Sequence, residues 1–205
     1  SVSALIHAAT MVTAGVFLIG RFFPLFDISN IMIYVALIGA LTSVFAASMG
    51  LVADDIKKVL AYSTISQLGY MVFALGIGAY APAIFHLFTH AFFKACLFLG
   101  AGSVHHASGT FNMKYMGGMR KVMPITYIAM MVSSLSLAGL FPLSGFWSKD
   151  EILAHAAHQE NLLGYVVLIL GLIAAFMTAF YMFRAIFLVF HGEWKGGGES
   201  EEKEL

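Results

Sequence analysis

Residues Pro82 to Gly102 read PAIFHLFTHAFFKACLFLGAG, and the rest of the chain is organised around them. This segment is long and apolar enough to cross a bilayer as a single helix, yet it contains His86, His90 and Lys94 at intervals of four residues. Each step of four advances about 40° around a helix, so the three side chains lie on one face over roughly 12 Å. Ionisable residues at membrane depth are costly and usually face a bundle interior or a wet cavity. The line therefore indicates that charge moves here.

Composition extends this conclusion to the whole chain. Its 205 residues are 60% hydrophobic and 11% charged, with a mean hydropathy of +0.87, whereas a soluble domain is typically about 25% charged. The apolar runs are too long for strands of an outer-membrane barrel, which alternate over about ten residues. The sequence therefore predicts an all-α, polytopic bundle of transmembrane helices in a lipid bilayer.

Charge and cysteine content exclude several classes of function. The formal net charge is zero, and the absence of a basic stripe argues against a nucleic-acid partner. Cys96 is the single cysteine and lies in an apolar run. Disulfides and cysteine-rich metal or iron–sulfur sites are thus excluded.

Six apolar stretches predict about six spans within one transmembrane domain over 1–191. We expect the fifth span to break near 142–147, where Pro142 and Gly145 stop regular helix. The remainder, 192–205, is a flexible acidic tail that looks like a truncated loop, so we expect the chain to be a piece of a longer protein. The expected spans are 2–23, 28–52, 59–79, 82–102, 124–157 and 162–190.

Basic residues gather on one side if these spans alternate. That side is then cytoplasmic, or its organellar equivalent, by the positive-inside rule. The segment DDIKK, Asp54 to Lys58, is most simply an orientation signal of this kind, and Lys58 is a secondary candidate for the point at which protons enter.

The line of His86, His90 and Lys94 has three possible interpretations. As a buried polar network it would pin helix packing. As a metal site it lacks a Glu within the histidine pair and an obvious third ligand, and a bis-histidine haem would need a partner such as His7 on a facing helix. Three ionisable groups on one face of a helix favour the third interpretation, which is proton transfer.

Magnitudes favour a relay over a single switch. Two unit charges about 10 Å apart interact by roughly 1.7 kcal/mol at an effective dielectric near 20. Moving one proton against about 180 mV costs roughly 4 kcal/mol, so one coupled pair is insufficient. The candidate relay groups are His7, His86, His90, Lys94 and the Lys149–Asp150 pair.

The segment SKDEIL, which begins at Ser148, has two readings. It is either the wet end of the fifth span or the restart of a broken helix, a device by which transporters line a cavity. Residues 124–141 barely cross a bilayer and 124–157 overshoot it, which favours the broken helix. Ser148 would then cap the second piece, and Lys149 and Asp150 would be functional.

Several motifs together resemble a known family. They are SALIHAATMVTAG, DIKKVLAYSTISQLGYM, IFHLFTHAFFKACLFL, GGMRK and GFWSKDEIL, in chain order. With them the chain resembles the antiporter-like membrane subunit five, or subunit L, of NADH:quinone oxidoreductase, respiratory complex I. The resemblance covers nearly the whole chain.

The resemblance implies an inverted-repeat fold, of which this chain holds one connecting helix and the second five-helix repeat. His7 then resembles the connecting histidine, while His86, His90 and Lys94 resemble the central relay. Lys149, with Asp150 beside it, resembles the terminal group. The parent subunit would move protons as NADH is oxidised and quinone reduced, in a bacterial cell membrane or mitochondrial inner membrane.

The same resemblance implies that this chain has no cofactor or metal of its own. NADH, FMN, iron–sulfur clusters and quinone would be bound elsewhere in the complex. The partners would be the other membrane subunits of complex I, especially a neighbouring antiporter-like subunit.

Three alternatives stay open. The large subunit of multi-subunit Na⁺/H⁺ antiporters shares these motifs, although some members have a lysine where this chain has Thr13. A plastid or cyanobacterial relative that uses ferredoxin is equally similar. The third alternative, a purely structural membrane anchor, leaves the ionisable line without a purpose.

Overall fold

The computed structural model describes Ile6 and residues 10–199, and these residues confirm the predicted all-α class. No strand occurs in this part of the chain; one isolated bridge joins Asp55 and Asn112. The helices are η2 (Met11–Thr13), α2 (Ala14–Arg21), α3 (Phe23–Ile28), α4 (Met32–Val52), α5 (Ile56–Gly76), α6 (Tyr80–Ser108), η3 (Met113–Tyr115), α7 (Pro124–Ala138), α8 (Ser144–His158) and α9 (Leu162–Phe190).

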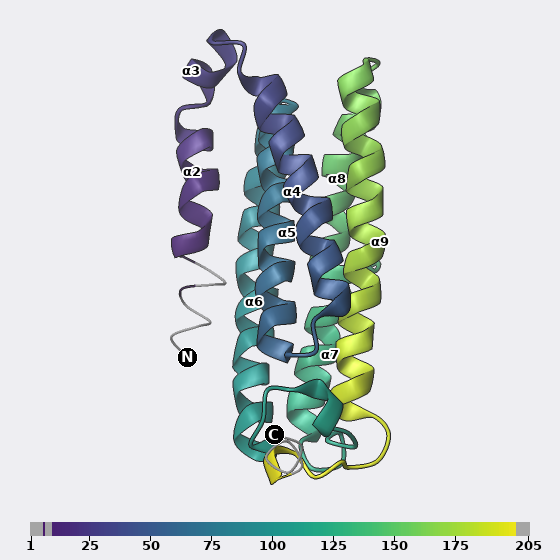
Figure 1. Ribbon diagram of the computed structural model, residues 1–205. Coiled ribbons are helices and arrows are strands. Elements are labelled where there is room, and N and C mark those ends of the chain that lie inside the picture. Colours follow the sequence, from purple (N-terminus) through teal and green to yellow (C-terminus); the bar gives the residue numbers. More distant parts are fainter. Residues whose placement is uncertain (1–5, 7–9, 200–205) are drawn as a thin grey trace.

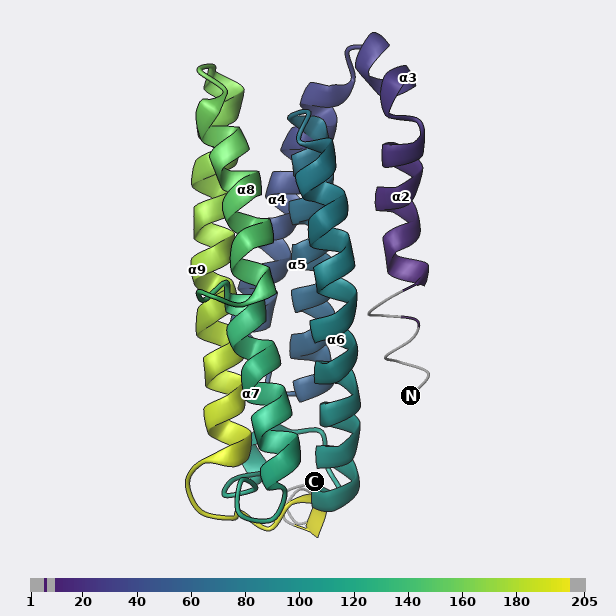
Figure 2. The ribbon, with the colours of Figure 1, turned by 180° about the vertical axis from the view of Figure 1, so that it is seen from behind.

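The long helices α4, α5, α6 and α9 run side by side along one axis (Figures 1 and 2). All four are long and apolar enough to cross a membrane. Helices α7 and α8 have 15 residues each and follow one another end to end beside α9 (Figure 2). They therefore form one interrupted crossing. The helix at the start, α2, has 8 residues and stands at the side of the bundle next to α6.

The break between α7 and α8 lies at 139–143, so the sequence placed it about three residues too late. Gly139 ends α7 because it adopts a left-handed conformation, with φ of 83°, which glycine reaches without steric cost. Helix α8 then begins at Ser144, with Leu143 before it. The prediction that Ser148 caps the second piece was wrong, since Ser148 lies one turn inside α8.

Small residues hold α4 against α5. A Cβ atom on Gly39 would lie 2.4 Å from the backbone nitrogen of Phe73, and one on Gly69 would lie 2.7 Å from the carbonyl oxygen of Gly39. Neither position tolerates a side chain, so the two backbones are in direct contact. Close approach over small residues is the usual way in which helices associate within lipid.

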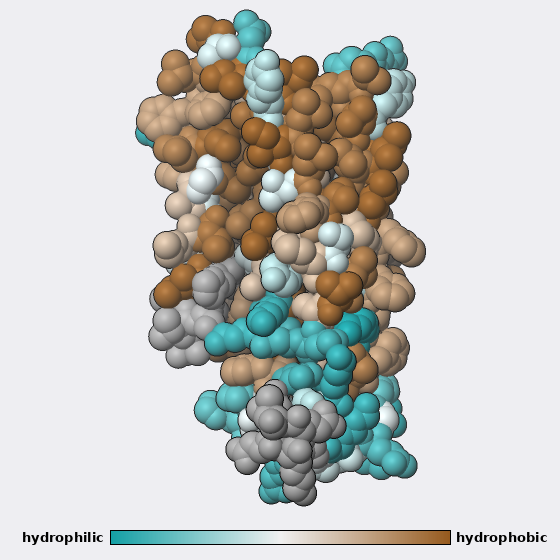
Figure 3. Space-filling model, viewed as in Figure 1, coloured by the Kyte–Doolittle hydropathy of each residue, from teal (hydrophilic) through white to brown (hydrophobic). Residues whose placement is uncertain are grey.

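Polarity is distributed unevenly over the surface. Figure 3 shows an apolar face over most of the molecule, with hydrophilic residues gathered at the end that holds the α4–α5 turn and the C-terminal segment. Large side chains such as Phe45 and Phe176 are exposed by 68% and 74%. An apolar surface of this extent is what a lipid-facing bundle requires.

Candidate functional site

His86 lies fully buried at the meeting point of α5, α6 and α8. Its Nδ1 atom is 2.8 Å from the Ser148 hydroxyl oxygen, and its Nε2 atom is 3.0 Å from the Gln67 side-chain oxygen. The Thr89 hydroxyl also donates to Ser148. Both ring nitrogens are therefore engaged, one toward α8 and the other toward α5.

Lys94 is two turns further along α6 and is also fully buried. Its ammonium group donates to the Ser63 hydroxyl at 2.6 Å and to the Leu60 carbonyl at 3.2 Å. The Tyr181 hydroxyl of α9 donates to the same Ser63 oxygen at 2.8 Å. Ser63 thus accepts from two buried donors on different helices.

A chain of side-chain hydrogen bonds joins Lys94 to His86. Beyond Tyr181 it continues to Thr178, which lies 3.3 Å from the Tyr181 hydroxyl and accepts from the Gln67 amide nitrogen at 3.4 Å. The opposite atom of the Gln67 amide faces His86. Sequence reasoning missed the connecting residues, which are uncharged, although polar side chains in the apolar runs of α5 and α9 were a readable signal. The connecting residues are Ser63, Gln67, Thr178 and Tyr181.

His90 lies between His86 and Lys94 on the same face of α6 but takes no part in this series of hydrogen bonds. It is fully buried, and neither ring nitrogen has a hydrogen-bond partner among the described residues. Its ring centroid is 6.2 Å from that of His86 and 5.5 Å from that of Phe93. The middle group of the predicted relay is therefore not committed to a fixed partner.

Lys149 points inward from α8 and is 4% exposed. Its ammonium group donates to the Leu137 carbonyl at 2.5 Å and lies 5.8 Å from the centre of the Tyr70 ring. Asp150, by contrast, is exposed, and no ion pair joins it to Lys149 in the part of the chain that the structure describes. The structure places the lysine in the site and its acidic neighbour outside it.

Two further predicted residues lie away from this buried site. His7 lies outside the described residues. Lys58 is exposed at the polar end of the bundle and lines a cleft of about 690 Å³ together with Asp55, Tyr62 and His105. Tyr62 is adjacent in sequence to Ser63, which brings the cleft close to the residues around Lys94.

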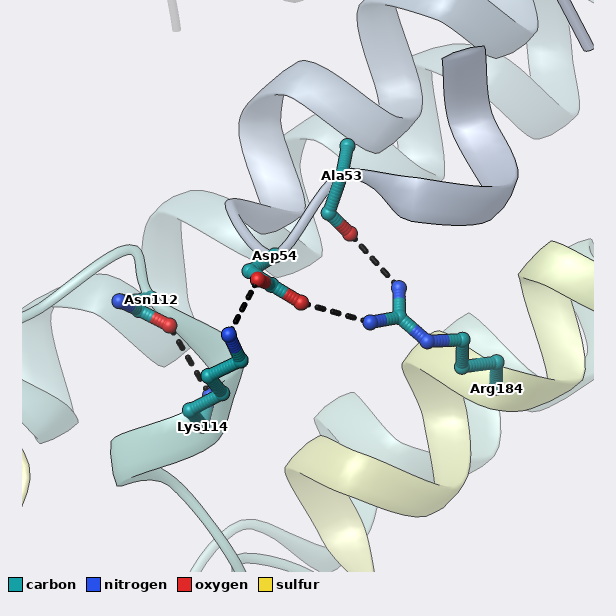
Figure 4. A network of polar contacts seen from close by, with 5 residues as sticks. All are labelled: Ala53, Asp54, Asn112, Lys114 and Arg184. Carbon is teal, nitrogen blue, oxygen red and sulfur yellow. Dashed lines mark hydrogen bonds and ion pairs between the residues drawn. The ribbon is translucent and has the colours of Figure 1, made fainter. Parts of the chain in front are cut away.

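Asp54, in the α4–α5 turn, forms a second polar network (Figure 4). Its carboxylate pairs with Lys114 and with Arg184, each at 2.6 Å, and Arg184 also donates to the Ala53 carbonyl. The Lys114 ammonium and, with it, the Arg184 guanidinium hold the pKa of Asp54 below its usual range. This network ties the turn to η3 and α9, so DDIKK has a structural role: Asp55 caps α5 by accepting from the Lys57 and Lys58 amides.

The described residues contain no group of three His, Cys, Asp or Glu that could hold a metal ion. The buried site combines two histidines, two lysines and several hydroxyl groups. Such groups exchange protons at membrane depth, and the arrangement is suited to moving a proton between helices α6 and α8.

Comparison with known proteins gives a consistent result. Residues 1–185 match the family model described as NADH:quinone oxidoreductase/Mrp antiporter, TM. NAD(P)H-quinone oxidoreductase chain 5 of Picosynechococcus sp. is 50% identical over 100% of this chain and 32% of its own length. NADH-quinone oxidoreductase subunit L of Rickettsia typhi is 53% identical over 95% of this chain and 29% of its own length. The chain thus spans about a third of these relatives, and the matches confirm the resemblance that the motifs indicated.

Solved structures show the same fold. The Mrp complex from Dietzia sp. contains a chain that is 38% identical, with a TM-score of 0.84 over 90% of this chain and 21% of that one. A membrane-bound sulfane sulfur reductase, described as an archaeal respiratory membrane complex, contains another at 27% identity, with a TM-score of 0.81 over 95% of this chain and 41% of that one.

Proposed function

The chain belongs to the NADH:quinone oxidoreductase/Mrp antiporter transmembrane family and is a multi-pass integral membrane protein, and we propose that its parent protein is a proton-translocating subunit of an NADH:quinone oxidoreductase. Protons would pass through His86, His90, Lys94 and Lys149 while NADH is oxidised and quinone reduced on other subunits. His7 would deliver protons to this relay, and Lys58, at the solvent-exposed end of the bundle, would mark the point at which protons enter. The partners would be membrane subunits, including a neighbouring antiporter-like one.

The observation that supports this proposal most is the burial of two lysines and two histidines in one site without a carboxylate partner there. Lys94 is completely buried and its ammonium group contacts only neutral oxygens among the described residues. A buried charge without a counter-charge is costly, and structural roles seldom justify it. A role in proton exchange explains the burial, because the Lys94 ammonium group can release its proton and become neutral.

His90 suits the role of transit group in this relay. His86 and Lys94 are anchored by hydrogen bonds, whereas both nitrogens of His90 are uncommitted within the described part of the chain. An imidazole can accept a proton on one nitrogen and release one from the other. His90 would therefore pass protons between two fixed neighbours.

A second candidate, the large subunit of a multi-subunit Na⁺/H⁺ antiporter, is favoured by the likeness to the Mrp complex. The relatives named as NAD(P)H- or NADH-quinone oxidoreductase subunits are more similar in sequence, which is why we prefer the redox-driven function. A Na⁺ gradient that drives proton movement through the parent protein without any redox substrate would favour the antiporter instead.

The proposal is tested by Lys94→Met and, separately, Lys149→Met in the parent complex. Quinone reduction and proton uptake into vesicles are recorded together, with assembly checked by native electrophoresis. We expect both activities to fall while the complex stays assembled, since the relay and the redox step are coupled.

The matched control is Lys57→Met. Lys57 lies on exposed surface, with its ammonium group 5.0 Å from the centre of the Phe111 ring, and belongs to no part of the proposed relay. It should keep both activities. Normal turnover with normal pumping in the Lys94 and Lys149 variants would contradict the relay.

A further inference from the structure

We infer that Gln67 is a positioning residue that holds His86 with its proton on Nε2, so that His86 takes up and releases protons only at Nδ1, the nitrogen beside Ser148. The two ring nitrogens of a histidine are distinct, and the hydrogen bond at one of them decides which is free to react. The inference rests on the proposed function for its use, but the state of His86 can be measured independently of transport.

The orientation of the Gln67 amide is set by Thr178. The Thr178 hydroxyl donates to the Ala174 carbonyl of its own helix at 2.7 Å, so its single proton is already engaged. Toward Gln67 it can therefore only accept, and it does so from the amide nitrogen at 3.4 Å. The carbonyl end of the amide is thereby turned toward His86.

This orientation determines the tautomer of His86. The Gln67 side-chain oxygen is an acceptor only and lies 3.0 Å from Nε2, so Nε2 must carry the proton. Nδ1 is then the basic nitrogen of neutral His86, and it faces the Ser148 hydroxyl at 2.8 Å. Both atoms are completely buried, where an unpaired donor or acceptor is costly.

Ser148 is suited to both protonation states of His86. While His86 is neutral, the Ser148 hydroxyl donates to Nδ1. Once Nδ1 is protonated it donates to the Ser148 oxygen, and the hydroxyl can turn to the Ser144 carbonyl at 3.2 Å or the Gly145 carbonyl at 3.4 Å. Proton uptake at Nδ1 therefore leaves no buried group without a partner, whereas uptake at Nε2 has no site to fill.

Gln67 also prevents protons from passing between His86 and Lys94 along the side-chain hydrogen bonds that join them. Its amide nitrogen donates on the Thr178 side and its oxygen accepts on the His86 side. A hydroxyl group can take up one proton and release another, but a carboxamide in this setting does neither. The route through Ser63 and Tyr181 is thus closed to protons at Gln67. A proton that passes between His86 and Lys94 through His90 must therefore enter or leave His86 at Nδ1.

The tautomer can be measured directly in the parent complex labelled with ¹⁵N-histidine. Solid-state NMR spectra of the wild type and of His86→Gln are subtracted to isolate the His86 signals. We expect a protonated Nε2 and an unprotonated Nδ1 for neutral His86. The reverse assignment, or an even mixture of the two tautomers, would overturn the inference even if the complex pumps normally.

Variants at the neighbouring positions test the cause. Gln67→Met removes the acceptor at nearly constant volume, and Thr178→Val removes the group that orients the amide. Both should populate the tautomer with the proton on Nδ1 and lower the rate of proton uptake by roughly tenfold or more, since a misplaced proton defeats a positioned acid–base group. Gln67→Glu keeps an acceptor at Nε2 and Thr178→Ser keeps the hydroxyl, so Nε2 should stay protonated in both.

The outcomes separate this inference from the proposed function. The expected tautomers in every variant with unchanged proton uptake would refute the role of His86 in transport and leave its positioning intact. Reduced proton uptake in Gln67→Met with an unchanged tautomer would refute the positioning role and leave the relay intact.

Discussion

The ammonium group of Lys149, on α8, donates a hydrogen bond to the carbonyl oxygen of Leu137 in the last turn of α7. Carbonyl groups at the C-terminal end of a helix lack partners within the helix and carry partial negative charge, so they favour a nearby cation. The lysine therefore joins the two half-helices at their break. Loss of its proton would remove a favourable interaction at the one irregular point of this crossing.

Lys149→Arg separates charge from proton exchange at this position. Arginine keeps the positive charge and can still donate to the Leu137 carbonyl, but it does not release its proton in proteins. We expect the variant complex to assemble and to lose proton uptake about as severely as Lys149→Met. Wild-type pumping with arginine would mean that Lys149 acts as a fixed charge.

Ser63→Ala should destabilise the parent protein by roughly 1–3 kcal/mol. The substitution deprives two buried donors, Lys94 and Tyr181, of their common acceptor. Ser43→Ala is the matched control, because the Ser43 hydroxyl is equally buried but has no hydrogen-bond partner in the described part of the chain. Thermal unfolding of the solubilised protein compares the two, and equal losses would contradict the assigned role of Ser63.

Gly69→Ala should destabilise the α4–α5 pair by roughly 1–3 kcal/mol, the usual cost of overpacking. The added methyl group would meet backbone atoms of Gly39 and Ser43, which cannot give way as a flexible side chain would. Gly102→Ala, in α6, meets nothing within 4 Å and should be neutral or slightly stabilising. The same unfolding measurement decides, and a neutral Gly69→Ala would show that α4 and α5 are not closely packed.

Asp54→Asn should cost up to about 1 kcal/mol at neutral pH, because partly exposed ion pairs contribute little. The pKa of Asp54 is lowered in the folded state, mainly by Lys114. Its contribution to stability is therefore present above the unfolded pKa and is lost as the pH falls through the lower, folded value.

The difference between wild type and Asp54→Asn should accordingly be constant from neutral pH down to about pH 4 and shrink below it. Asp27→Asn is the control, since Asp27 is exposed and makes no ion pair among the described residues. A difference that stays unchanged well below pH 4 would contradict the assignment to this carboxylate.

The sequence was informative where placing a residue in an apolar span costs free energy. His86, His90 and Lys94 were found because an ionisable group in an apolar run needs a reason, and helical spacing alone puts the three on one face. The break before Lys149 was visible for a similar reason, since Pro142 interrupts the apolar run that begins at Pro124, although Gly145, also expected to stop the helix, lies inside α8.

The residues that orient these groups could not be predicted in the same way. Gln67 and Thr178 are uncharged, and their importance depends on how α5 and α9 rotate about their axes, which is decided by packing between distant segments. The side of α8 that Asp150 occupies depends on the register of that helix after the break. Gly139 fixes this register, and the sequence placed the break later.

We propose that protons pass between His86 and Lys94 through His90, because the hydrogen-bonded route past Tyr181 is closed at Gln67. The test records proton uptake and quinone reduction together in the parent complex, in His90→Leu and in Tyr181→Phe. We predict that His90→Leu abolishes proton uptake by this subunit, while Tyr181→Phe retains most of it. Loss of uptake in Tyr181→Phe together with normal uptake in His90→Leu would show that protons pass Tyr181 and not His90.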